Sequence, residues 1–176
     1  MSVHKLHLYT GPGKGKTTAA MGLALRALGH GQRVLIAQFM KNGKSGELTA
    51  LANLPGATVS LAAPISKFTF SMNASELDKT RMEQTGHARS LIKMLSSLSP
   101  DTVILDELAV AVSGGFIDEE TARMLISLSL STAETVVTGR NAPDWLRDMS
   151  DYMSVIVAEK HPYNTENLPA REGVEW

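Results

Sequence analysis

Residues 9–18 read Tyr-Thr-Gly-Pro-Gly-Lys-Gly-Lys-Thr-Thr, and this run constrains the fold more than any other part of the chain. It follows an apolar run at residues 3–9 and precedes a helical pattern at residues 17–28. A strand, a glycine-rich turn, a Lys-Thr pair and a helix in that order are typical of a loop that holds phosphate groups. Glycines let backbone N–H groups turn towards phosphate oxygens, and the start of the helix adds free donors and a positive dipole end.

The candidate phosphate-binding residues in this run are Gly11, Pro12, Gly13, Lys14, Gly15, Lys16, Thr17 and Thr18. We expect the Lys16 ammonium to contact terminal phosphate oxygens and the Thr17 hydroxyl to bind Mg²⁺. The alternative is a glycine turn with two solvated lysines, which the flanking strand and helix disfavour. The standard loop has four residues between its first glycine and the Gly-Lys pair. Gly11 and Gly15 enclose three, so an unusual nucleotide pose is expected.

The composition indicates an ordinary globular protein, which we expect to form a single domain over residues 1–176. Hydrophobic residues make up 43% and charged residues 20% of the chain. The net charge of −1 predicts neither a nucleic-acid partner nor an anionic membrane partner. The absence of cysteine excludes disulfides, thiolate metal sites and a thiol nucleophile, and it fits a cytoplasmic location. The first residues predict a strand rather than a signal peptide, and no apolar run is long enough to cross a membrane.

Strand and helix patterns alternate along the chain. Apolar runs predict strands at residues 3–9, 33–39, 57–61, 102–105, 134–138 and 152–158, and periodic segments predict helices at residues 17–28, 47–53, 75–98, 119–130 and 143–149. The run at 33–39 is nearly continuous in apolar residues, which indicates a strand buried on both faces, as in a parallel sheet. We therefore predict an α/β, P-loop NTPase-like fold of three layers with a mostly parallel central sheet.

Some helix ends and helix faces are also predicted. Met21, Leu25 and Leu28 are expected together on the buried face of the first helix. Ser75, with Asp78 three residues later, predicts the start of the long helix, and Asp118 is expected to cap the next one. The apolar positions of the long helix are Ala88, Leu91, Ile92, Leu95 and Leu98. The polar segments at residues 41–46 and 161–176 are expected to be irregular, and the first lies at the strand ends where ligands bind in such sheets.

Two acids, Asp106 and Glu107, end the apolar strand expected at residues 102–105. After a phosphate loop, a carboxylate at this place is the expected ligand of Mg²⁺, either directly or through water. Either Asp106 or Glu107 fills that role. The alternative is that these acids cap the next helix.

Four more side chains are candidates for the site. Arg140 follows a strand at the same sheet edge, where a guanidinium would contact phosphate or ribose oxygens, or else it is a surface residue at a turn. Arg26 interrupts an apolar helix face and is expected to reach solvent. Phe68 and Phe70 would share one face of an extended segment, either as core residues or as a surface for a flat ligand. No nucleophilic side chain is recognisable, so the chain is expected to position ATP for attack by a second bound molecule.

Taken together, nine stretches of the chain resemble the P-loop class of ATP:cob(I)alamin adenosyltransferases, the corrinoid adenosyltransferases. In family order they are YTGPGKGKTTAA, LRALGHG, AQFMK, SGE, KFTF, VILDEL, VTGR, KHPY and AREGVEW. The shortened loop is itself a feature of that family. The family commonly has a tryptophan where this chain has Phe70, and an N-terminal segment that covers the corrinoid site, whereas a few residues precede the first strand here.

The resemblance implies that ATP binds with Mg²⁺ in a reversed pose and that the Co(I) centre of cob(I)alamin, or of a related corrinoid, attacks its 5′ carbon. Lys16 would stabilise the triphosphate, and Arg26 and Arg140 match family positions near the nucleotide. Phe68 and Phe70 match aromatic residues that displace the lower ligand of the corrinoid. The resemblance also implies a homodimer and a flavoprotein reductant. The competing hypotheses are a P-loop ATPase or phosphotransferase with another acceptor, and a non-catalytic module that binds ATP or corrinoid.

Overall fold

Six parallel strands form the central sheet of the protein, and the computed structural model describes residues 4–174 around it. The strands are β1 (Leu6–Thr10), β2 (Val34–Gln38), β3 (Ala57–Leu61), β4 (Thr102–Asp106), β5 (Glu134–Thr138) and β6 (Tyr152–Val155). Their order across the sheet is β3-β2-β4-β5-β1-β6, and every pairing is parallel. The prediction of a mostly parallel sheet is therefore confirmed.

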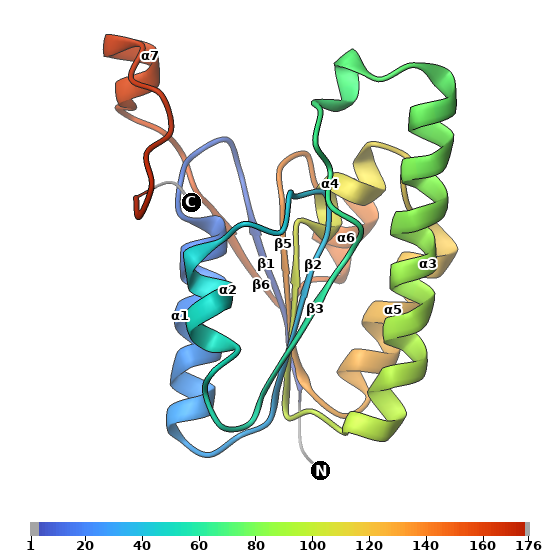
Figure 1. Ribbon diagram of the computed structural model, residues 1–176. Helices are drawn as coiled ribbons and strands as arrows, with labels where there is room; N and C mark the ends of the chain where they lie inside the picture. Colours follow the sequence, from blue (N-terminus) through green and yellow to red (C-terminus); the bar gives the residue numbers. More distant parts are fainter. Residues whose placement is uncertain (1–3, 175–176) are drawn as a thin grey trace.

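Helices cover both faces of the sheet and make the three layers (Figure 1). On one face lie α1 (Lys16–Gly29) and α2 (Gly46–Leu51). On the other lie α3 (Ala74–Leu98), α4 (Leu108–Ser113), α5 (Glu119–Leu130) and α6 (Asp144–Met149). The short α7 (Pro162–Glu166) projects beyond the carboxyl ends of the strands. Within residues 4–174, no helix has the length and apolar content needed to cross a membrane.

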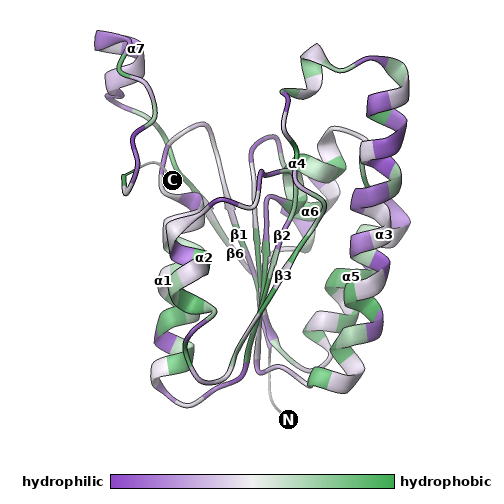
Figure 2. Cartoon of the chain, in the orientation of Figure 1, coloured by the Kyte–Doolittle hydropathy of each residue, from purple (hydrophilic) through white to green (hydrophobic). Residues whose placement is uncertain are grey.

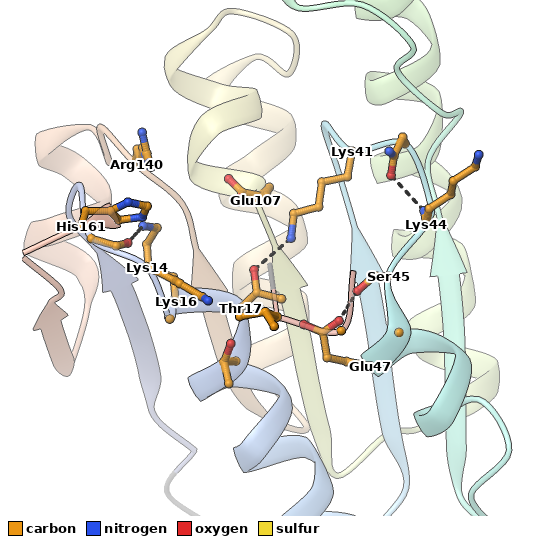
Figure 3. Close-up of a pocket in the computed structure, with 17 residues that line it drawn as sticks. Lys14, Lys16, Thr17, Lys41, Lys44, Ser45, Glu47, Glu107, Arg140 and His161 are labelled. Carbon is orange, nitrogen blue, oxygen red and sulfur yellow. Dashed lines mark hydrogen bonds between the residues drawn. The ribbon is translucent and has the colours of Figure 1, made fainter. Parts of the chain in front are cut away.

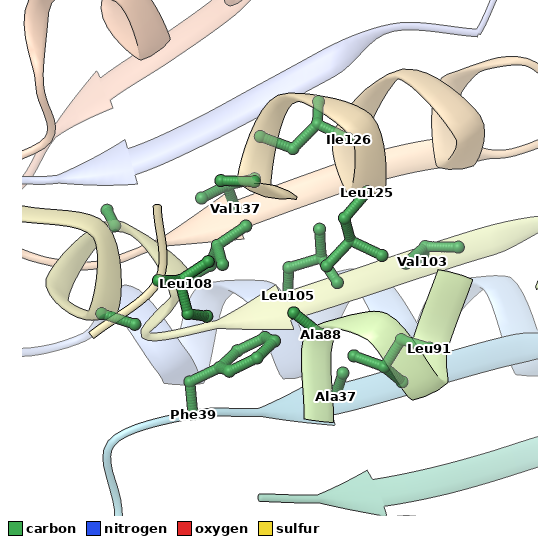
Figure 4. Packing of buried hydrophobic residues seen from close by; sticks show 14 of the residues in the cluster. Ala37, Phe39, Ala88, Leu91, Val103, Leu105, Leu108, Leu125, Ile126 and Val137 are labelled. Carbon is green, nitrogen blue, oxygen red and sulfur yellow. The ribbon is translucent and has the colours of Figure 1, made fainter. Parts of the chain in front are cut away.

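The sheet is apolar because its strands are buried on both sides. All five residues of β2 are buried, and they alternate between two cores: Val34 and Ile36 face α1, whereas Leu35 and Ala37 face α3. Figure 4 shows Ala37 beside Leu91 of α3 within the larger core. Figure 2 shows hydrophobic residues along the strands and many hydrophilic residues on α3, as expected for a helix with one side in water.

The buried face of α1 differs from the predicted one. Met21 and Leu28 are buried as predicted, but Leu25 is 54% exposed, so that part of the prediction is wrong. The remaining buried apolar residues of the helix are Ala20, Ala24 and Ala27. Small alanine side chains, rather than the larger leucine, face the sheet and allow the helix to lie close to it.

The long helix α3 also begins earlier than predicted. Its cap is Asn73 and not Ser75: the Asn73 side chain accepts from the Glu76 backbone N–H at 3.0 Å, and Glu76 accepts from the Asn73 N–H at 2.9 Å. This is a complete capping box two residues upstream of the predicted one. Asp118 caps α5 as predicted, since it accepts from the Thr121 N–H at 2.7 Å.

The remaining differences are at the ends of elements and in two short helices. The first strand occupies residues 6–10 rather than 3–9, where Val3 lies outside the described residues, and the last strand stops at residue 155 rather than 158. Two short helices, α4 and α7, were not predicted. The sequence of α4, LAVAVS, has no polar face because the helix is largely buried, so its helical period is not visible.

Candidate functional site

A cavity of about 600 Å³ lies over the carboxyl ends of the strands (Figure 3). Its walls are the loop and helix start at residues 13–18, the segment at residues 41–47 after β2, and parts of the C-terminal tail, including His161. Its cationic residues are Lys14, Lys16, Lys41, Lys44 and Arg140, against the two acids Glu47 and Glu107. An excess of cations over a glycine-rich loop at this sheet edge suits an anionic ligand with several phosphate groups.

The glycines of the loop are required by its packing. Gly11 and Gly15 have φ angles of 101° and 114°, which side chains rarely adopt. A Cβ atom on Gly11 would collide with the Ile156 carbonyl, and one on Gly13 would lie 2.6 Å from the Val157 carbonyl oxygen. The Gly13 N–H donates to the Ile156 carbonyl at 2.8 Å. The compressed loop, which is the shortened glycine-rich loop at residues 11–15, is thus held between β1 and the segment that follows β6.

Lys16 is folded back onto the loop that carries it. Its ammonium donates to the carbonyl oxygens of Gly11 at 2.9 Å and Gly13 at 2.5 Å. The residue is 6% exposed. Burial, together with the positive charge of Arg140, lowers the pKa of Lys16. The ammonium therefore occupies the mouth of the loop and has the loop's own carbonyl oxygens as partners.

Asp106, at the end of β4, is the centre of a buried polar network. Its side chain is fully buried and accepts four hydrogen bonds. The donors are Thr17 at 2.9 Å and Thr138 at 2.7 Å to Oδ1, and Gln38 at 2.9 Å and Lys41 at 2.8 Å to Oδ2. Burial by itself would raise the pKa of Asp106, but the charge of Lys41 and these hydrogen bonds outweigh it, so the pKa is lowered. The carboxylate is ionised and fixed in orientation.

Three members of this network were not among the predicted site residues. Gln38 and Thr138 are the last residues of buried apolar strands, and Lys41 lies in the polar segment after β2. A buried polar residue at a strand end is a signal that sequence reasoning can use, because such a group needs a partner. The parallel register then pairs Gln38 with Asp106. Predicting that pairing requires knowing that β2 and β4 are neighbours in the sheet, and no single sequence motif gives the strand order.

Glu107 lies between β4 and α4, where the chain turns out of the sheet. It has a φ angle of 59° and occupies the N-cap position of α4, but its side chain makes no cap hydrogen bond. The carboxylate instead lines the cavity (Figure 3). Burial and the charge of Asp106 raise the pKa of Glu107. Glu107 is thus placed at a cap, which was the alternative prediction for this pair of acids, while its carboxylate faces the candidate site.

No group of three His, Cys, Asp or Glu side chains that could hold a metal ion occurs within the described residues. A cation here would instead draw on Thr17, Asp106 and Glu107 together with oxygens of the ligand. One or two carboxylates plus phosphate oxygens is the usual arrangement for Mg²⁺. The ammonium of Lys41, which already lies against Thr17 and Asp106, is an observed cation at these oxygens.

The other predicted residues divide into two groups. Arg140 lines the cavity, as predicted for a residue at this edge. Arg26 lies in the last turn of α1, where it is exposed to solvent as expected, and it is outside the cavity lining. Phe68 and Phe70 are 75% and 86% exposed, which excludes the alternative of core packing and leaves that of an exposed surface for a flat ligand; Thr69–Ser71 form a 3-10 helix instead of the expected extended segment. Their rings stack on each other at 5.2 Å and 9° above the sheet edge, outside the cavity lining.

Comparison with known proteins agrees with this geometry. The family described as ATP:corrinoid adenosyltransferase BtuR/CobO/CobP matches residues 3–176. A corrinoid adenosyltransferase of Pseudomonas aeruginosa is 29% identical over 172 residues, which cover 97% of this chain and 83% of that protein. A corrinoid adenosyltransferase of Escherichia coli is 29% identical over 170 residues, covering 96% of this chain and 84% of that protein. With its full described length matched, this chain belongs to the ATP:corrinoid adenosyltransferase BtuR/CobO/CobP family.

Proposed function

We propose that this chain transfers the 5′-deoxyadenosyl group of ATP to the Co(I) centre of a corrinoid such as cobalamin or cobinamide. The cobalt–C5′ bond forms, the C5′–O5′ bond breaks, and the electron pair of that bond leaves on the triphosphate. The observation that carries the proposal is the cationic cavity over the compressed loop, in a chain of this family. Co(I) is itself a strong nucleophile, which agrees with the lack of a recognisable nucleophilic side chain at the site.

The role proposed for the loop is to bind the leaving triphosphate. Its N–H groups and the Lys16 ammonium would stabilise the negative charge that grows on the leaving oxygen. Lys14 and Thr18 line the same cavity and would bind outer phosphate oxygens, and Arg140 would contact phosphate or ribose oxygens. Holding C5′ in line with cobalt supplies the proximity effect. Arg26 stays a predicted nucleotide-binding residue, although it is distant along α1 from the loop.

We further propose that Thr17, Asp106 and Glu107 hold a divalent cation, Mg²⁺, with the triphosphate. Hydroxyl and carboxylate oxygens are the hard donors that Mg²⁺ prefers, and the ionised state of Asp106 suits this role. The cation would neutralise charge on the departing triphosphate. The hydrogen bonds that Asp106 accepts from Thr138 and Gln38 fix the orientation of its carboxylate and keep Oδ1 against the Thr17 hydroxyl.

Phe68 and Phe70 are proposed to face the corrinoid. Two exposed rings stacked in parallel offer a flat apolar surface above the sheet edge. Leaving such a surface in water is unfavourable, which suits a binding surface. There they would displace the lower ligand of the corrinoid and ease reduction of Co(II). We also propose a homodimer and a flavoprotein reductant, as the family resemblance implies, and a cytoplasmic location and a single domain over residues 1–176, as the composition indicates.

Product analysis tests the reaction. Protein, ATP, Mg²⁺ and chemically reduced cob(I)alamin are incubated, and the nucleotides and corrinoids are separated by chromatography. We expect adenosylcobalamin and inorganic triphosphate in equal amounts, and neither product when the cobalamin is left unreduced. ADP and phosphate would identify a P-loop ATPase or phosphotransferase instead. Tight binding of both ligands without any product would identify a non-catalytic module.

A further inference from the structure

The ammonium of Lys41 lies between two oxygens that are proposed to hold the divalent cation. Its Nζ atom donates to Thr17 Oγ1 at 2.9 Å and to Asp106 Oδ2 at 2.8 Å. Figure 3 shows the side chain reaching from the end of β2 to Thr17. Thr17 gives its own proton to Asp106 Oδ1 at 2.9 Å, so the ammonium uses an acceptor lone pair of the hydroxyl. A metal ion on Thr17 would also bind through such a lone pair.

The acceptor positions of Asp106 are filled at the same time. Each of its oxygens accepts two hydrogen bonds, and a carboxylate has about four lone-pair sites in all. A metal ion that binds this carboxylate directly must therefore displace a donor. Gln38 and Thr138 are 3% and 0% exposed and are fixed on strands. The Lys41 side chain is 30% exposed and has a flexible stem, so it is the donor that is free to leave.

From this geometry we propose that Lys41 is a tethered cation that occupies the metal position before nucleotide binds. The metal ion that enters with the triphosphate replaces the ammonium on Thr17 and Asp106, and Lys41 moves to the phosphate oxygens. This proposal rests on the proposed metal and nucleotide site and assigns Lys41 two positions within it. The exchange keeps the buried Asp106 carboxylate paired at every stage, because an unpaired buried charge is costly. It also disfavours metal binding in the absence of nucleotide.

The test measures metal binding without nucleotide or corrinoid, so its outcome is independent of adenosyl transfer. Mn²⁺, a paramagnetic substitute for Mg²⁺, is titrated into the nucleotide-free protein, and free Mn²⁺ is followed by electron paramagnetic resonance. The variants are Lys41→Met and Lys41→Gln, whose side chains cannot place an ammonium at this position. The matched control is Lys44→Met, which removes the same charge from the same cavity but from a lysine with no hydrogen bond to Thr17 or Asp106.

We expect both Lys41 variants to bind Mn²⁺ at least about tenfold more tightly than the unaltered protein, since a hydrogen-bonded charge no longer competes. Lys44→Met is expected to change the affinity about twofold, through the general loss of positive charge. The proposal is overturned if the Lys41 variants gain no more than Lys44→Met, or if they bind no Mn²⁺. Thermal melts followed by circular dichroism verify that each variant is folded. The two substitutions at position 41 differ in polarity, so agreement between them removes effects of one particular side chain.

Discussion

Thr138 is the residue whose replacement tests the buried network most directly. Its hydroxyl donates to Asp106 Oδ1 at 2.7 Å and accepts from the Glu107 backbone N–H at 3.0 Å. Thr138→Val keeps the shape of the side chain and removes both hydrogen bonds. The side chain is fully buried at the end of β5, so water cannot easily replace the lost partners. We therefore expect this substitution to lower the free energy of unfolding.

The magnitude follows from the two lost bonds. A hydrogen bond to a charged group contributes about 1.5–3 kcal/mol, and the partly buried Glu107 N–H left without a partner costs about 1 kcal/mol more. Burying a methyl group in place of the hydroxyl returns about 0.8 kcal/mol. The free energy of unfolding is therefore expected to fall by about 2–3 kcal/mol. In urea this shifts the unfolding midpoint by about 1 M, given slopes of about 1–3 kcal/mol/M.

Thr135→Val on the same strand is the matched control. Thr135 is also fully buried, but its hydroxyl makes one bond to a neutral carbonyl, that of Ala133 at 3.2 Å. Its loss is expected to cost about 1 kcal/mol or less. Both variants undergo the same chemical change in the same strand, so the difference in unfolding free energy reports the Asp106 network. Equal losses in the two variants would refute the importance of that network for stability.

Three further outcomes are expected. Lys16→Ala should abolish triphosphate formation and weaken ATP binding measured by calorimetry, because the loop loses its buried cation; unchanged turnover would mean that the loop is not the active site. Phe70→Ala should impair turnover from cob(II)alamin supplied with a reduced flavoprotein more than turnover from pre-reduced cob(I)alamin, and equal losses would argue against a role in reduction. Burial lowers the pKa of His87 from 6.5 to about 4, so the folded protein holds this ring neutral and loses stability as the pH falls from 6.5 towards 4. His87→Gln should flatten that part of the stability profile in urea titrations, and an unaltered slope would contradict the argument.

The parts of the fold that could be predicted are those that local chemistry decides. Gly13, Gly15 and Lys16 belong to one short local pattern and Glu107 directly follows the fourth strand, and all four residues line the cavity. Leu25 was misplaced because helix periodicity does not say which of two adjacent stripes meets the sheet. For Phe70 the sequence left two alternatives, core packing or an exposed surface, because the spacing of two aromatic residues is the same in both; only the fold shows that the ring is exposed.

The partners of Asp106 show why the remainder required the fold. Thr17, Gln38, Lys41 and Thr138 come from four different segments, which the fold brings together at the carboxyl ends of the parallel strands. The strand residues among them hold the carboxylate still, whereas the cations at the site are carried on flexible stems. The Lys16 ammonium donates hydrogen bonds to Gly11 and Gly13, and the Lys41 ammonium donates to Thr17 and Asp106. Both ammonium groups therefore already have partners within the protein. Binding of a polyphosphate at this site is then an exchange of partners, and its affinity depends on how much better the phosphate oxygens satisfy these ammonium groups than the protein's own oxygens do.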